Sequence, residues 1–121
     1  MDLKLHSPPG EEVLSVATAG RITARELVGS LDRNPLQDLL GRAWAQRKVA
    51  LDMAETDFVD SAAVGWLIQT HRDLQRAGGA MVLHSIRPTV MQMFQLLKVG
   101  QAIPLRNNEQ AARALLCGDR P

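Results

Sequence analysis

The sequence predicts an α/β fold built on a mixed β-sheet of four to five strands. Near the N-terminus an alternating apolar and polar segment is separated by Pro8-Pro9-Gly10 from an apolar segment, which indicates two short antiparallel strands. Further along, an apolar run, a segment with helical periodicity and a second apolar run follow one another. That order is typical of two parallel strands joined by a helix.

The N-terminal third contains two predicted strands and two predicted helices. The strands are Leu3–Leu5 and Val13–Ala17. A helical pattern then starts at Ala24 and is interrupted by Asn34-Pro35, a pair that favours a new helix start because asparagine caps and proline fits the first turn. The first pattern has its apolar residues at Leu27, Val28 and Leu31, and the second at Leu36, Leu39, Leu40, Ala43 and Trp44.

The middle of the chain predicts a strand, a helix and a second strand. Val49–Met53 is short and apolar and is followed by polar residues 55–57, which is typical of a central strand that ends there. The helix begins after Asp60-Ser61 and ends at Gly78-Gly79, and Ala80–His84 is the next strand. One helical stripe is predicted to be buried, at Val64, Leu67, Ile68, His71 and Leu74.

The C-terminal part predicts a helix, a short strand and a final helix. Pro88 starts a helix, and residues 102–105 form a strand whose proline indicates an edge position or an early stop. Residues 107–109 cap the last helix. The first helix should bury Val90, Met93, Phe94 and Leu97, and the last should dock on the sheet through Ala111, Ala112, Leu115 and Leu116.

Composition narrows the function classes. The 121 residues are most simply one domain, 1–121, with a core of about 13–116. The 14 basic and 13 acidic residues give a net charge of +1, so we expect no nucleic-acid binding. No apolar run approaches the roughly 18 residues needed to span a bilayer, so we expect no membrane insertion. Cys117 is the lone cysteine, and His6, His71 and His84 make a poor ligand set, so we expect no metal and no other cofactor. The N-terminus lacks a signal-peptide core, and a cytoplasmic location is expected.

One serine stands where a strand ends and a helix begins, within the segment Val59–Gly65. An exposed hydroxyl at this place lies beside the unpaired backbone N–H groups of the first helical turn, which tolerate added negative charge. Ser61 therefore suits a reversible phosphate. The simpler alternative is that Asp60 and Ser61 only cap the helix, since both residue types are favoured there.

The sequence resembles a known family in the order and spacing of four segments. These are the strand Val49–Met53, the motif Phe58-Val59-Asp60-Ser61, the helix end at Ala77-Gly78-Gly79, and residues 81–88. The family is the sulphate transporter and anti-sigma factor antagonist (STAS) domain, in its small bacterial single-domain form. The resemblance runs from about Val13 to Leu116. It implies a mixed β-sheet with helices packed mainly on one side.

The resemblance implies a partner-switching role. In family members that regulate sigma factors, the serine at the position of Ser61 is phosphorylated by a partner kinase that doubles as an anti-sigma factor. The unphosphorylated domain binds that kinase and frees the sigma factor, and a phosphatase resets the phosphorylated form. This chain departs from the family pattern at Ala62 and Ala63, and at Thr23, where members often carry aspartate.

The residues predicted to contact a partner are Thr23, Asp60, Ser61, Ala62, Trp66 and Met91. Trp66 is either an aromatic anchor for a partner or is buried against a neighbouring helix. Met91 is either an adaptable contact or a single exposed apolar residue.

Three functions compete. The first is an anti-sigma factor antagonist-like signalling module that is switched off by phosphorylation at Ser61. The second, favoured by Thr23, is a non-phosphorylated STAS accessory or scaffold subunit of a transporter or sensory complex. The third is an enzyme with Ser61 as nucleophile, but the chain lacks the Gly-x-Ser-x-Gly elbow, so we expect no catalytic residues. The oligomeric state does not follow from the sequence.

Overall fold

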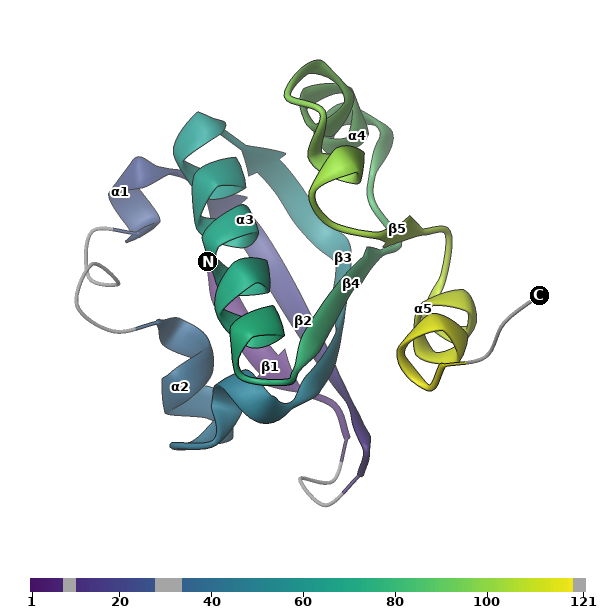
Figure 1. The fold of residues 1–121 in the computed structure, drawn as a ribbon. Coiled ribbons are helices and arrows are strands. Elements are labelled where there is room, and N and C mark those ends of the chain that lie inside the picture. The colour runs from purple at the N-terminus through teal and green to yellow at the C-terminus, as the bar shows by residue number, and fades with distance from the viewer. Residues whose placement is uncertain (8–10, 28–33, 119–121) are drawn as a thin grey trace.

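A five-stranded sheet forms the centre of the computed structural model, which describes residues 1–7, 11–27 and 34–118 (Figure 1). The strand order is β1-β2-β3-β4-β5. The first pair is antiparallel and the other three pairs are parallel, so the predicted mixed sheet is confirmed. The strands are β1 (Asp2–Leu5), β2 (Val13–Ile22), β3 (Lys48–Val59), β4 (Ala80–His84) and β5 (Leu105–Arg106).

Four of the described helices lie on one face of this sheet and the fifth lies on the other. The helices are α1 (Ala24–Leu27), α2 (Pro35–Leu40), α3 (Ser61–Arg76), α4 (Pro88–Leu96) and α5 (Glu109–Leu116), with 3₁₀ turns η2 (Trp44–Gln46) and η3 (Val99–Gln101). Alternate strand residues divide the core: Leu51 belongs to the main cluster with residues of α1–α4, whereas Ala50 belongs to a smaller cluster with α5. The expectation that helices pack mainly on one side is confirmed.

Helix α3 is the central helix of the main face. Most of its predicted stripe is buried, and Ile68 is only partly buried. Gly79 follows this helix and lies against the backbone of residues 45–47. A Cβ atom at Gly79 would collide with the carbonyl oxygens of Ala45 and Arg47. Glycine is therefore required at this position to let the chain turn from α3 into β4.

Strand β3 is longer than the sequence predicts. It does not end at Met53 but runs on to Val59, and β2 likewise runs to Ile22. Beyond Asp52, β3 pairs only with β2, and the register shifts twice, so exposed polar residues can be accommodated within a strand. Thr56 is buried there, and its hydroxyl donates a hydrogen bond of 3.2 Å to the Thr18 carbonyl oxygen.

Helix α2 is shorter than its apolar pattern predicts. The Asn34 cap is confirmed, because its side chain accepts a hydrogen bond of 2.9 Å from the Leu36 N–H. The helix ends at Leu40 because Gly41 takes a φ of 88°, so Trp44 lies in the separate turn η2. The predicted helical positions Val28 and Leu31 lie outside the described residues.

The C-terminal elements correct two further predictions. Leu97 is 38% exposed rather than buried, because α4 ends at Leu96 and a left-handed residue at Lys98 turns the chain so that Val99 is buried instead. The strand predicted at 102–105 covers only Leu105–Arg106. The N–H groups of residues 102 and 103 both donate to the Val99 carbonyl oxygen, so this backbone is coiled before β5 begins.

Helix α5 docks on the second face of the sheet. Its predicted cap is confirmed, since Asn108 accepts a hydrogen bond of 2.8 Å from the Ala111 N–H. Ala112 and Leu116 are buried, whereas the predicted contacts at 111 and 115 are only partly buried. Arg113 ties the helix to the sheet by donating a hydrogen bond to the Ser15 hydroxyl on β2.

Candidate functional site

The candidate site lies where β3 ends and α3 begins. Asp60 is the N-cap of α3, with extended backbone, and its Oδ1 accepts a hydrogen bond of 2.9 Å from the Ala63 N–H. Aspartate is among the residues that best satisfy the unpaired donors of a first helical turn. Ser61 is the first residue of the helix and is exposed. The structure thus places the serine hydroxyl at the helix N-terminus, where solvent reaches the residue.

The second carboxylate oxygen of Asp60 reaches a different helix. Oδ2 accepts a hydrogen bond of 3.0 Å from the N–H of Ala24, the first residue of α1. One carboxylate therefore joins the beginnings of α1 and α3. These backbone N–H groups, first that of Ala24 and then that of Ala63, lower the pKa of Asp60 because they stabilise its charged form. Asp60 is therefore ionised at neutral pH.

Thr23 is adjacent to this link in the chain. Its hydroxyl donates a hydrogen bond of 2.9 Å to the carboxylate of Glu26 within α1. Ala62 is exposed and follows Ser61 directly. Four of the six predicted contact residues are therefore brought together, namely Thr23, Asp60, Ser61 and Ala62.

The other two predicted contact residues are placed differently. Trp66 is partly buried against the main core, and its indole N–H is buried with no hydrogen-bond partner among the described residues. Met91 lies on α4, also partly buried, where it lines a hollow of about 320 Å³ with Phe94 and Lys98. Both side chains contribute largely to packing.

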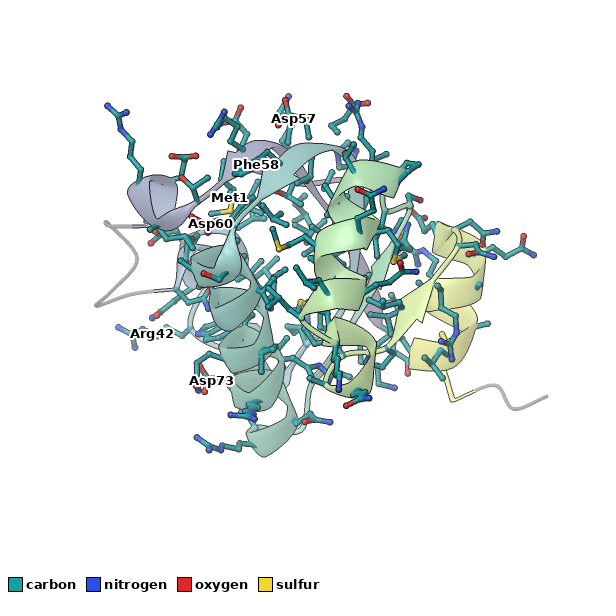
Figure 2. All side chains as sticks on the ribbon, turned by 90° about the horizontal axis from the view of Figure 1, so that it is seen from above. Met1, Arg42, Asp57, Phe58, Asp60 and Asp73 are labelled. Atoms are coloured by element: carbon teal, nitrogen blue, oxygen red, sulfur yellow. The ribbon has the colours of Figure 1, made fainter. Side chains whose placement is uncertain are left out.

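Sequence reasoning missed an exposed aromatic residue beside the site. Phe58 is 43% exposed, and the guanidinium carbon of Arg21 on β2 lies 4.8 Å from the centre of its ring. This is a cation–π contact between residues paired in register. Asp57, Phe58 and Asp60 gather at one end of the molecule (Figure 2). The exposure of Phe58 could not be predicted from the sequence, because the register shifts in β3 break the simple alternation of inward and outward residues.

The two buried histidines and the acidic residues of the described chain do not form a second centre of charge or metal ligation. Burial lowers the pKa of His71 and of His84, which keeps both rings neutral at pH 7. No three side chains of the metal-ligating types gather in the part of the chain that the structure describes. Within the same part, no helix combines the length and the apolar character that a membrane crossing requires.

Comparison with known proteins identifies the class. The model of the STAS domain family matches residues 17–112. The chain therefore belongs to the STAS domain family.

Individual relatives agree with this assignment. BtrV of Bordetella bronchiseptica, named as a candidate anti-sigma factor antagonist, is 28% identical over 69 residues, which cover 57% of this chain and 60% of BtrV. The match thus spans less than two thirds of that relative. Among solved structures, an anti-sigma factor antagonist (STAS) domain protein of Planctomyces limnophilus has a TM-score of 0.73 at 18% identity, covering 97% of this chain and 99% of that one.

SpoIIAA, an anti-sigma factor antagonist, is similar in its unphosphorylated form, with a TM-score of 0.68 at 18% identity and coverage of 99% of this chain and 100% of that one. The phosphorylated form of Bacillus SpoIIAA gives a TM-score of 0.60 at 17% identity, covering 94% and 99%. At these identities the likeness concerns the fold, which is the STAS fold predicted from the sequence.

Proposed function

We propose that this protein is an anti-sigma factor antagonist-like signalling module. It binds a partner anti-sigma kinase through the surface around Ser61, where β3 ends and α3 begins, and it is switched off by phosphorylation of Ser61. The observation that carries the proposal is the exposed serine at the start of α3, directly after a cap residue that two backbone N–H groups hold in place. The name of BtrV and the existence of SpoIIAA in phosphorylated and unphosphorylated forms support the same role.

The local charges explain how a phosphate would act. A phosphoserine carries about −1.5 to −2 charges near neutral pH. The N-terminus of α3 stabilises this negative charge by roughly 0.3 to 1 kcal/mol. Repulsion from the ionised Asp60, next to Ser61, destabilises it. The fold therefore changes little, and the main effect falls on a partner docked over Ser61, through repulsion and added bulk. ATP and magnesium belong to the kinase in this scheme, and the domain itself supplies no catalytic residue.

The docking surface is centred on residues that the fold brings together. Thr23, Asp60, Ser61 and Ala62 form its centre, and the exposed ring of Phe58 lies beside it. Trp66 and Met91 present only part of their side chains, so we assign them to its margin. The partners of this surface would be a serine kinase that acts as an anti-sigma factor, and a phosphatase, all in the cytoplasm.

Phosphorylation by a candidate anti-sigma kinase tests the proposal. Incubation with that kinase and magnesium ATP should add one phosphate to the intact mass, and Ser61→Ala should abolish the addition. Thr89→Ala is the matched control, because Thr89 is an exposed hydroxyl residue in the first turn of α4. Ser61→Asp should weaken kinase binding. Labelling of Ser61→Ala at the wild-type level would refute the proposed acceptor.

A second function is favoured by Thr23. Where family members often have aspartate, this chain has a threonine whose hydroxyl is already bonded to Glu26. That arrangement suits a non-phosphorylated STAS accessory or scaffold subunit of a transporter or sensory complex. Partner binding would then be unchanged in both Ser61→Ala and Ser61→Asp.

A further inference from the structure

Two leucines at the end of α4 are exposed to solvent. Leu96 is 74% exposed and Leu97 is 38% exposed, and the two are adjacent in the chain. Among the described residues, the large apolar side chains that are exposed in this way are these two and Phe58, which lies beside Ser61. The pair can therefore serve as the apolar centre of an interface.

Unpaired positive charges flank these leucines. Lys98 follows Leu97 directly, and Arg72 and Arg76 belong to α3, the helix beside α4 (Figure 2). All three basic residues are exposed, and none of their side chains forms an ion pair or a hydrogen bond within the described residues. Each charge is therefore available to a partner.

Arg72 lies on the side of α3 that faces α4. Gln75 is three residues further along and so lies on the same side of the helix, where it borders a hollow together with residues 100–104, which follow α4. The other flank of α3 faces α2, because the Thr70 hydroxyl accepts a hydrogen bond of 2.9 Å from the Asn34 side chain. The second half of α3 and the end of α4 therefore present one continuous face.

Acidic residues are scarce on this face. Within residues 61–101 the acid is Asp73. Its carboxylate accepts a hydrogen bond of 2.9 Å from the Gln69 side chain, and Figure 2 shows Asp73 on the side of α3 away from α4. The remaining basic residue of this stretch, Arg87, lies at the start of α4, where its guanidinium is 3.7 Å from the Glu55 carboxylate. The leucine pair is therefore surrounded by positive potential.

We propose that this face binds an acidic amphipathic helix of a partner protein. The apolar side chains of that helix cover Leu96 and Leu97, and its carboxylates pair with Arg72, Arg76 and Lys98. The N–H groups of Leu97 and Lys98 already donate to carbonyl oxygens within α4, so this end of the helix offers no free N–H group. The partner must satisfy its own backbone, which a helix does.

An anionic membrane fits the same face less well. Surfaces that bind anionic lipids carry clusters of about four to eight Lys and Arg residues, whereas here the unpaired cations are Arg72, Arg76 and Lys98. Stable anchoring also requires a second signal, such as a lipid chain or a large apolar helix face, and two leucines supply little of either. The observations therefore favour a protein partner.

This inference is independent of the phosphorylation proposal. The leucines lie at the C-terminal end of α4, whereas Ser61 is the first residue of α3. Ser61→Ala should leave binding at the leucine face unchanged. Failure of one proposal therefore leaves the other standing.

The test uses the full chain labelled with ¹⁵N and two sets of capped helical peptides of about five turns. Both sets carry leucines along one helix face, and the flanking positions are glutamate in one set and lysine in the other. We expect at least one glutamate peptide to bind, to shift the amide signals of residues 72–76 and 96–98, and to bind more weakly as salt is raised. The lysine peptides should bind at least tenfold more weakly.

Three results would overturn the proposal. The first is equal binding of both peptide sets, the second is a set of shifts confined to other parts of the chain, and the third is a glutamate set without a binder. Cosedimentation with phosphatidylserine vesicles in the absence of any peptide binding would assign the face to a membrane instead.

Charge reversal provides matched variants. The double variant Arg72→Glu with Lys98→Glu should weaken binding of the glutamate peptide at least tenfold and should strengthen binding of the lysine peptide. Leu96→Ser should also weaken binding at least tenfold. Arg42→Glu is the control, because Arg42 is exposed and Figure 2 places it away from α4. Unchanged binding in the double variant would contradict the proposed ion pairs, with circular dichroism confirming that each variant is folded.

Discussion

Removing the carboxylate of Asp60 should loosen two helices at once. In Asp60→Ala, the loss of the α3 cap costs about 1 kcal/mol of unfolding free energy. The N–H of Ala24 also loses its acceptor at 3.0 Å, and because this bond is exposed, water replaces it in part, leaving a further cost of about 0.5 to 1 kcal/mol. The expected total is close to 2 kcal/mol, or a shift of roughly 1 M in the urea midpoint.

Asp60→Asn separates the two contributions. Asparagine caps helices about as well as aspartate, but its amide has one acceptor oxygen, so it can serve Ala63 or Ala24 and not both. We therefore expect about half the loss seen in Asp60→Ala. Asp57→Asn is the control, since Asp57 is an exposed acid whose side chain has no hydrogen bond to any described residue, and this variant should unfold as the wild type does.

The pH dependence supplies an independent check on the same carboxylate. Its pKa is lowered in the folded state, so the unfolded chain takes up the proton first as the pH falls. The stabilisation is present at pH 7, begins to fade below about pH 4 and is lost as the pH passes through the folded pKa. The gap between wild type and Asp60→Asn should narrow from pH 7 to pH 3 in urea titrations followed by circular dichroism. A constant gap, or wild-type midpoints in both variants, would refute the shared-cap reasoning.

Three further predictions concern the rest of the fold. Arg113→Met should lower the unfolding free energy by about 1 to 3 kcal/mol in urea titrations, because the buried Ser15 hydroxyl loses its partner on α5. Burial lowers the pKa of His84, so below about pH 6.5 the unfolded chain takes up a proton before the folded one. The free energy of unfolding should therefore fall from pH 7 to pH 5, and His84→Gln should show a shallower fall. Gly79→Ala should cost about 1 to 3 kcal/mol in thermal unfolding, since its Cβ meets the Arg47 carbonyl, and a wild-type transition would contradict that contact.

Local signals made α3 and the position of Ser61 predictable. The helix has a long apolar stripe, an aspartate cap and glycines at its end, all within one stretch of sequence. The antiparallel first pair and the parallel central pair followed from turn residues and from the strand-helix-strand order in the same way. Asn34 and Asn108 were recognised as caps because capping depends on neighbours only two or three residues away.

Features set by distant residues were not predictable. The bond between Asp60 and Ala24 joins positions 36 apart in the chain, and nothing local to either residue indicates it. The full length of β3 depends on pairing with β2, and the burial pattern of 55–59 depends on two register shifts. The edge position of β5 was anticipated from Pro104, but the strand begins only after this proline and does not stop at it. The face of the sheet on which α5 packs is likewise not specified by the apolar spacing of that helix.

The extension of β3 has an electrostatic consequence. Beyond its last pairing with β4 at Asp52, the strand continues for seven residues, to Val59. At about 3.3 Å per residue this carries the following serine roughly 20 Å past β4. Ions at physiological strength screen exposed charges over about 8 Å, so at the surface of the domain a charge gained at Ser61 fades well before it reaches the start of β4. Whatever approaches the far end of β4 would sense the same potential in both covalent states of the domain.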